Sequence, residues 1–180
     1  MGASEVSYTK IHLKLEEKNF KPAPWGAISE EQANYDRFYE LMKRVGEGSN
    51  WHRRKMFNEA ASINRLKELF IKPGAHLWVF RQGENDVGFC QAANVEDLST
   101  LFNKQSGVGE IFKIGMFPEY VGKGLAAGYV SSVVWELFKE FQTIYLNTRD
   151  TNSVNSVPFY ERLGFEVLNK QVCPDDYVSL

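Results

Sequence analysis

A short glycine-bearing turn, Gly122-Lys123-Gly124-Leu125-Ala126, carries the clearest chemical signal in the sequence. Glycines allow a backbone to approach a ligand closely, and the first N–H groups of a helix are free to bind an anion such as a phosphate. The turn therefore predicts either a phosphate site built from main-chain N–H groups or a strand-to-helix turn whose glycines serve packing alone.

The segments on either side indicate which elements position this turn. Residues 110–117 combine Ile, Phe and Met with few polar residues, which is typical of a strand covered on both faces. Pro118 cannot donate to a sheet ladder, so the strand ends there. In residues 126–141 apolar side chains recur at helical spacing, which predicts a helix buried on one side.

Two common nucleotide-binding loops do not fit these residues. The nucleoside-triphosphate loop needs Ser or Thr directly after Gly-Lys, where Gly124 stands, and GxGxxG needs a glycine where Ala127 stands. The turn instead resembles motif A of the GCN5-related N-acetyltransferases (GNAT), written Q/R-x-x-G-x-G/A, with Val121 in place of the first Gln or Arg. In that family the turn holds the pyrophosphate of acetyl-coenzyme A.

A second segment at the family's spacing supports the resemblance. Residues 160–165, Tyr-Glu-Arg-Leu-Gly-Phe, look like the end of motif B, Y-x-x-x-G-F. Asn152 and Asn155 stand where that family usually has an asparagine that opens the helix leading into this segment. The resemblance covers roughly residues 76–172.

The resemblance implies acetyl-coenzyme A as co-substrate, with its pantetheine along the main chain of Gly115, Met116 and Phe117 and its pyrophosphate at the glycine turn. Lys123 either adds a charge contact or is simply solvated. The implied cofactor-binding residues are Gly115, Met116, Phe117, Val121, Gly122, Lys123, Gly124, Leu125, Ala126 and Asn152.

The resemblance also nominates two catalytic residues. Tyr160 would protonate the departing thiolate, and the alternative is that it only packs beneath the central strand. Glu110 would accept the proton of the amine, and the alternative is an ordinary surface carboxylate. In an unbroken strand Glu110 shares a face with Phe112, Ile114 and Met116, whereas Lys113 lies on the other face. An apolar surrounding would then raise the pKa of Glu110.

The amine acceptor is less well defined by the sequence. The loop of residues 51–54, Trp-His-Arg-Arg, suits an anionic or planar acceptor but also reads as an ordinary surface loop. Asn147 and Thr148, at the end of a predicted strand, are acceptor contacts by resemblance or plain caps of the next loop. The acceptor is expected to be a small molecule or a peptide, and the family's frequent dimers allow a homodimer.

Three functional readings follow. The first is an acetyl-coenzyme-A-dependent N-acetyltransferase in which a primary amine attacks directly, without a covalent intermediate. The second is a binding module with the same fold that senses acyl-coenzyme A without turnover. The third is an interaction domain whose glycines serve packing only.

Composition limits the other classes of function. The chain has 180 residues, 43% of them apolar and 24% charged, with a net charge of −2, as in an ordinary soluble protein of one domain over residues 1–180. The charge gives no argument for nucleic acid or a membrane surface as partner. Cys90 and Cys173 have no metal-ligand spacing, so no metal is expected, and without a signal peptide the expected location is the cytoplasm.

The predicted order of elements is strand, two helices, three strands, helix, strand, helix and strand, which is α+β. Ser29 and Gln32 form a capping box for the first helix, which ends at Gly46 in a left-handed conformation. By resemblance, this order corresponds to the GNAT fold, a mixed, mostly antiparallel central sheet flanked by helices, with a splay between its two central strands.

Overall fold

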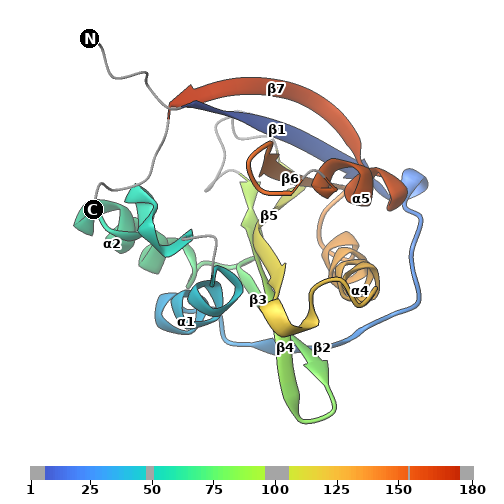
Figure 1. Cartoon of the computed structure of the whole chain (residues 1–180), viewed down its shortest axis with the longest axis horizontal. Coiled ribbons are helices and arrows are strands. Elements are labelled where there is room, and N and C mark those ends of the chain that lie inside the picture. Colours follow the sequence, from blue (N-terminus) through green and yellow to red (C-terminus); the bar gives the residue numbers. More distant parts are fainter. Residues whose placement is uncertain (1–6, 48–50, 96–105, 154, 175–180) are drawn as a thin grey trace.

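The computed structural model describes residues 7–47, 51–95, 106–153 and 155–174 (Figure 1). Its strands are β1 (Ser7–Glu16), β2 (Ala27–Glu31), β3 (His76–Gln82), β4 (Asn85–Asn94), β5 (Val108–Met116), β6 (Thr143–Arg149) and β7 (Glu166–Pro174). The α-helices within these residues are α1 (Tyr35–Val45), α2 (Ala60–Leu69), α4 (Ala126–Phe138) and α5 (Ser156–Arg162).

All seven strands form one sheet in the order β2-β3-β4-β5-β6-β1-β7. Neighbouring strands are antiparallel except for β5 and β6, which are parallel. The sheet is therefore mixed and mostly antiparallel, which confirms the predicted α+β fold.

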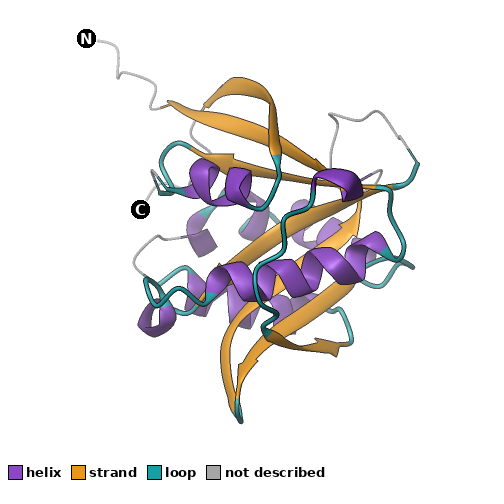
Figure 2. Cartoon of the chain, turned by 90° about the vertical axis from the view of Figure 1, so that its right-hand side faces the viewer, coloured by secondary structure: helices purple, strands orange, loops and turns teal. Residues whose placement is uncertain are grey.

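Helices cover both faces of this sheet (Figures 1 and 2). On one face, Val133, Val134 and Leu137 of α4 share a buried core with Leu13 and Ile144. On the other face, the helices α1 and α2 bury a second core with the strands β3 and β4, which includes Phe38, Met42, Leu66, Val79 and Phe89. Each face of the sheet thus has its own hydrophobic core.

The strand β5 carries one extra residue opposite β4. Gln91 pairs with Lys113, but the next residue of β4, Ala92, pairs with Ile111. Phe112 is left between the two pairs and forms a β-bulge. Bulges of this kind reverse the alternation of side chains along a strand and are common next to active sites.

The bulge overturns the predicted faces of β5. Ile114 and Met116 pack into the core beneath α4. The register places Glu110 and Lys113 together on the opposite face, toward α1 and α2. The prediction that Glu110 lies with Ile114 and Met116, and opposite Lys113, is wrong because it assumed an unbroken strand.

The first helix begins later than the sequence predicts. Ser29 lies in the edge strand β2, which pairs with β3, so the capping box is wrong. The cap of α1 is Asn34, whose Oδ1 accepts a hydrogen bond of 2.9 Å from the N–H of Arg37. The strand β2 was missed because its sequence, AISEE, is short and polar, as exposed edge strands often are.

The end of α1 also differs from the prediction. Gly46 has φ of −81°, which is not left-handed. A Cβ at this position would lie 3.0 Å from the Cβ of Trp51. Glycine is therefore favoured here by the close approach of Trp51 rather than by a left-handed cap.

A Schellman motif ends α5. The N–H of Phe165 donates to the C=O of Tyr160 at 3.1 Å, and the N–H of Gly164 donates to the C=O of Glu161 at 3.0 Å. Gly164 has φ of +101°, and a Cβ there would overlap the carbonyl oxygen of Asn19. The rings of Phe165 and Tyr160 lie 5.5 Å apart, which is the apolar contact that often accompanies this motif.

We predict that Gly164→Ala lowers the free energy of unfolding by about 3 kcal/mol, because it adds a steric overlap to an unfavourable φ. Gly83→Ala is the matched control, since Gly83 has φ of +60° with nothing within 4 Å of its would-be Cβ. It should cost only about 1 kcal/mol. Urea denaturation measures both variants, and equal losses would contradict this account of α5.

Candidate active site

The strands β5 and β6 part in the middle of the sheet. They pair only between residues 108–111 and 143–146. Beyond that point a cleft of about 750 Å³ lies between them, and this is the predicted splay. Its lining comes from residues 111–116 of β5, 146–149 of β6, Ser7, Tyr8, Val45, Trp51, Arg54, Val121, residues 151–153, Ser156 and Tyr160.

The backbone of β5 turns hydrogen-bonding groups toward this cleft at alternate residues. The N–H of Phe117 donates to the C=O of Val87 at 2.8 Å, and the C=O of Gly115 points toward Gly88 of β4. Since successive residues of a strand point their backbone groups to opposite edges, Ile114 and Met116 direct theirs into the cleft. The sequence missed Ile114 because the register was not known.

The structure changes the predicted roles of Gly115 and Phe117. The N–H and C=O of Phe117 are both hydrogen-bonded, the C=O accepting from the N–H of Tyr120 at 2.9 Å. Its ring is buried, and it lines neither cavity. These contacts do not favour its predicted role as a cofactor contact. Gly115 lines the cleft, but a Cβ there would overlap Val45, so this glycine lets α1 lie close to β5.

The glycine turn is open and rich in free donors. Gly122 and Gly124 have φ of 78° and 74°, and a Cβ at either would meet no atom within 4 Å. Glycine is needed there for the backbone conformation and not for packing. Within the described part of the chain, the N–H groups of residues 122–127 donate to no backbone or side-chain acceptor. Leu125, the residue before α4, provides no side-chain cap.

A second cavity of about 430 Å³ lies between this turn and α5. Met116 and Val121 line both cavities, so the cleft continues to the glycine turn. The rest of its lining is Tyr120, Gly122, Gly124, Leu125, Ala126, Ala127, Phe159, Arg162 and Leu163.

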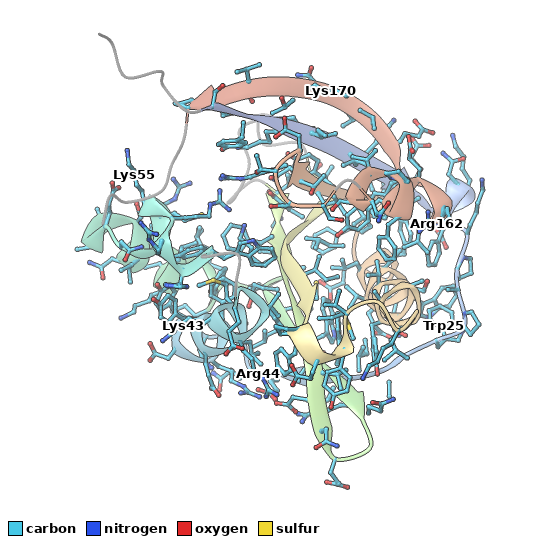
Figure 3. The ribbon with its side chains drawn as sticks, in the orientation of Figure 1. Trp25, Lys43, Arg44, Lys55, Arg162 and Lys170 are labelled. Carbon is cyan, nitrogen blue, oxygen red and sulfur yellow. The ribbon has the colours of Figure 1, made fainter. Side chains whose placement is uncertain are left out.

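Two cations lie near the glycine turn. Lys123 does not line the cavity, and its Nζ lies 5.2 Å from the centre of the Tyr120 ring. Arg162 of α5, labelled in Figure 3, does line it, with its guanidinium 6.0 Å from the Phe159 ring. Arg162 was missed because it occupies an unrestricted position of the Y-x-x-x-G-F pattern, although its place on a short helix after Tyr160 was a usable signal.

Tyr160 lines the cleft from α5 and is held by aromatic neighbours. The Phe159 ring lies 5.1 Å from the Tyr160 ring, and the Phe165 ring also packs against it as part of the helix cap. Burial raises the pKa of Tyr160 well above its usual range, and the buried Cys90 adds to the shift. The phenol is therefore neutral and a hydrogen-bond donor at any physiological pH.

Glu110 lies at the vertex where the two strands part. It is 3% exposed, and its Oε2 is buried without a hydrogen-bond partner among the described residues. Burial raises the pKa of Glu110 from 4.5 to about 8, although Lys113 and Lys10 act in the opposite direction. It is not the ordinary surface carboxylate of the alternative reading. Glu110 does not itself line the cleft; its neighbour Ile111 does.

Polar residues of β6 and the loop after it line the other side of the cleft. Asn147 and Thr148, the candidate acceptor contacts, both line it. Asn152 also lines it and donates to Oγ1 of Thr148 at 3.2 Å. Asn155 directly precedes α5 but makes no side-chain cap.

Within the described ranges, no group of three or more His, Cys, Asp and Glu side chains is arranged to hold a metal ion. None of the helices described combines the length and apolar character that a membrane span needs.

We predict that Glu110 makes stability fall as pH rises. The folded protein keeps a proton on Glu110 that the unfolded chain releases above pH 4.5, so between pH 4.5 and about 8 the free energy of unfolding decreases by about 5 kcal/mol. Glu110→Gln should abolish this decrease. Thermal unfolding across pH measures it, with Glu84→Gln in the exposed β3–β4 turn as control. Parallel curves for wild type and Glu110→Gln would contradict the burial argument.

Comparison with known proteins agrees with this geometry. The model of the acetyltransferase (GNAT) family matches residues 35–165. No curated protein sequence matches the chain.

Three solved structures illustrate the likeness in fold. A GCN5-related N-acetyltransferase from Sphaerobacter thermophilus has a TM-score of 0.56 at 17% identity, over 92% of this chain and 50% of that one. Another from Kribbella flavida has a TM-score of 0.54 at 14% identity, over 88% and 54%. The aminoglycoside N-acetyltransferase AAC(6')-Iy, in complex with CoA, has a TM-score of 0.52 at 19% identity, over 78% and 89%.

The chain spans about half the length of the first two of these structures. The family model, in contrast, covers most of the chain and includes the glycine turn and the lining of the cleft except Ser7 and Tyr8. This chain therefore belongs to the GNAT acetyltransferase family.

Proposed function

We propose that residues 1–180 act as one acyltransferase domain that moves an acetyl group from acetyl-coenzyme A to a primary amine by direct attack. The observation that carries the proposal is the continuous groove that joins the cleft between β5 and β6 to the free N–H groups of the glycine turn. A thioester with a long pantetheine and a pyrophosphate requires a groove of this kind, with strand-like backbone groups at one end and an anion site at the other.

The described residues fit acetyl-coenzyme A at both ends. The N–H groups of residues 122–127 would hold the pyrophosphate, and Arg162 would add a cation beside it. Ile114 and Met116 would bond the pantetheine amides. The bound co-substrate supplies the acetyl thioester, and its thiol is the leaving group.

Tyr160 would stabilise the departing sulfur by donating a hydrogen bond. A cysteine-like thiol has a pKa of about 8.5, so a phenol with a pKa raised far above 10 is a poor source of a whole proton. A neutral hydroxyl can still donate a strong hydrogen bond to a developing thiolate. We therefore assign Tyr160 the role of hydrogen-bond donor at the sulfur.

Glu110 would accept the proton of the attacking amine. Its pKa of about 8 lies close to working pH, where a general base is most effective. Because Glu110 lies one residue behind the cleft lining, the proton would reach it through a bridging water. Its unpartnered Oε2 is the acceptor on this path.

We predict that acetyl-coenzyme A raises the thermal unfolding midpoint, since it binds only the folded state. Gly124→Trp should abolish the rise because the indole fills the space open to the pyrophosphate. Gly83→Trp is the control, since it places the same side chain at another positive φ in open space on the far hairpin. If acetyl-coenzyme A raises the unfolding midpoint of the folded Gly124→Trp variant as much as that of the wild type, the pyrophosphate assignment is wrong.

We predict that Tyr160→Phe lowers kcat about 100-fold and leaves the affinity for acetyl-coenzyme A nearly unchanged. Thiol release measures kcat, and calorimetric titration measures affinity. If the wild type binds acetyl-coenzyme A but turns over no amine, the non-catalytic sensor replaces the enzyme as the best reading.

A further inference from the structure

Arg162 lies at the wall of the second cavity, at the end of α5. It is the one charged residue among the described residues that line this cavity. Its guanidinium lies 6.0 Å from the centre of the Phe159 ring, and within the described part of the chain it forms no ion pair and no hydrogen bond. A ring contact of this kind attracts a cation but leaves its N–H donors available to an anion.

The helix α5 presents a different face to each cavity. Ser156 and Tyr160, four residues apart, line the cleft between β5 and β6. Phe159 and Arg162, three residues apart, line the second cavity together with Leu163. Residues three or four apart lie on one face of a helix. A ligand whose thioester lies near Tyr160 therefore meets Arg162 only with the part of it that lies in the second cavity.

Two separate anion-binding features face the second cavity. The N–H groups of residues 122–127 lie on the side of the glycine turn, and Arg162 lies on the side of α5. Backbone N–H groups at a helix start can bind a phosphate without help from a cation. The rest of the lining is mostly apolar, with Tyr120, Leu125 and Leu163 among its residues. A cavity of about 430 Å³ lies in the range of about 300–1,000 Å³ that holds drug-sized ligands, so it has room for more than a pyrophosphate.

We propose that Arg162 binds the 3′-phosphate of coenzyme A, so that the site selects the 3′-phosphorylated cofactor over its dephospho form. The inference rests on the acetyltransferase function proposed above. The pyrophosphate would take the N–H groups of the turn, and the adenosine would lie against the apolar lining between the turn and Arg162. Coenzyme A carries its 3′-phosphate on this adenosine, apart from the pyrophosphate, which matches the two separate anion-binding features.

Calorimetric titration with coenzyme A and with dephospho-coenzyme A tests the inference without turnover. The dephospho form keeps the pyrophosphate and lacks only the 3′-phosphate. We expect the wild type to bind coenzyme A about tenfold more tightly, because an Arg–phosphate pair forms charge-assisted, often bidentate hydrogen bonds. Added salt should shrink this difference, since Arg162 is exposed.

Variants of Arg162 tie the preference to its side chain. Arg162→Gln should weaken the binding of coenzyme A alone and reduce the preference to less than about twofold, whereas Arg162→Lys should keep part of it, because an ammonium retains the charge but not the planar fork. Lys43→Gln is the control. Lys43 is also an exposed cation beside a ring of its own helix, 5.8 Å from the Tyr39 ring, but it lies on α1, away from Arg162 (Figure 3). Its loss should change neither affinity.

Three results would overturn the assignment of Arg162. The first is equal binding of the two cofactors by the wild type. The second is an equal loss for both cofactors in Arg162→Gln, which would place the guanidinium at the pyrophosphate. The third is a preference that disappears in Lys123→Gln but not in Arg162→Gln, which would give the 3′-phosphate to Lys123.

In each of these cases coenzyme A still binds, so the proposed function stands while this inference fails. If coenzyme A does not bind at all, the proposed function fails first, and the assignment of Arg162 fails with it.

Discussion

The end of pairing between β5 and β6 is the constraint on which the rest of the site depends. Both strands stay fixed by their other neighbours, since β5 pairs with β4 up to Met116 and β6 pairs with β1 up to Arg149. They are parallel to each other for only a few residues and then part. Two strand edges in the middle of a sheet are thereby left without a partner strand, and a ligand that resembles a strand can supply the missing hydrogen bonds.

The same divergence sets the electrostatics. At the vertex the strands are still close, so Glu110 is buried and its pKa is raised. Tyr145 pairs with Glu110 across the two strands, and its hydroxyl lies 2.5 Å from Nδ1 of His12. Beyond Ile111 and Leu146 the two strands part, and the cleft lies between them. The buried Glu110 and the open cleft thus follow one another along the sheet.

The sequence predicted the parts of the site that depend on local chemistry. Gly122 and Gly124 have a left-handed backbone conformation that favours glycine, and Gly164 ends a helix where a Cβ would overlap Asn19. Each of these requirements is met by a glycine at a single position, which can be recognised in the sequence. Tyr160 could be found because its position is tied to that helix end. The first core helix and the central helix α4 could be predicted because their apolar spacing is regular.

The remaining features depend on pairing between distant segments. The sequence of β5 alone does not indicate the bulge at Phe112, because the bulge is defined by the pairing with β4. Glu110 and Lys113 were therefore predicted on opposite faces of the strand, whereas they lie on the same face. Phe117 reads as a continuation of the strand, but its backbone groups are used by Val87 and Tyr120. Arg149 reaches the cleft only because β6 diverges from β5 after Leu146, which no local pattern shows.

Hydrogen–deuterium exchange of the backbone amides, with and without saturating acetyl-coenzyme A, tests most directly whether the splay and the glycine turn form one cofactor site. The N–H groups of residues 122–127 have no described acceptor and should exchange fast in the free protein. We expect acetyl-coenzyme A to slow exchange in residues 122–127 and at Ile114 and Met116, with β2 and β7 unchanged. Slowed exchange elsewhere, with residues 122–127 still fast, would contradict the account.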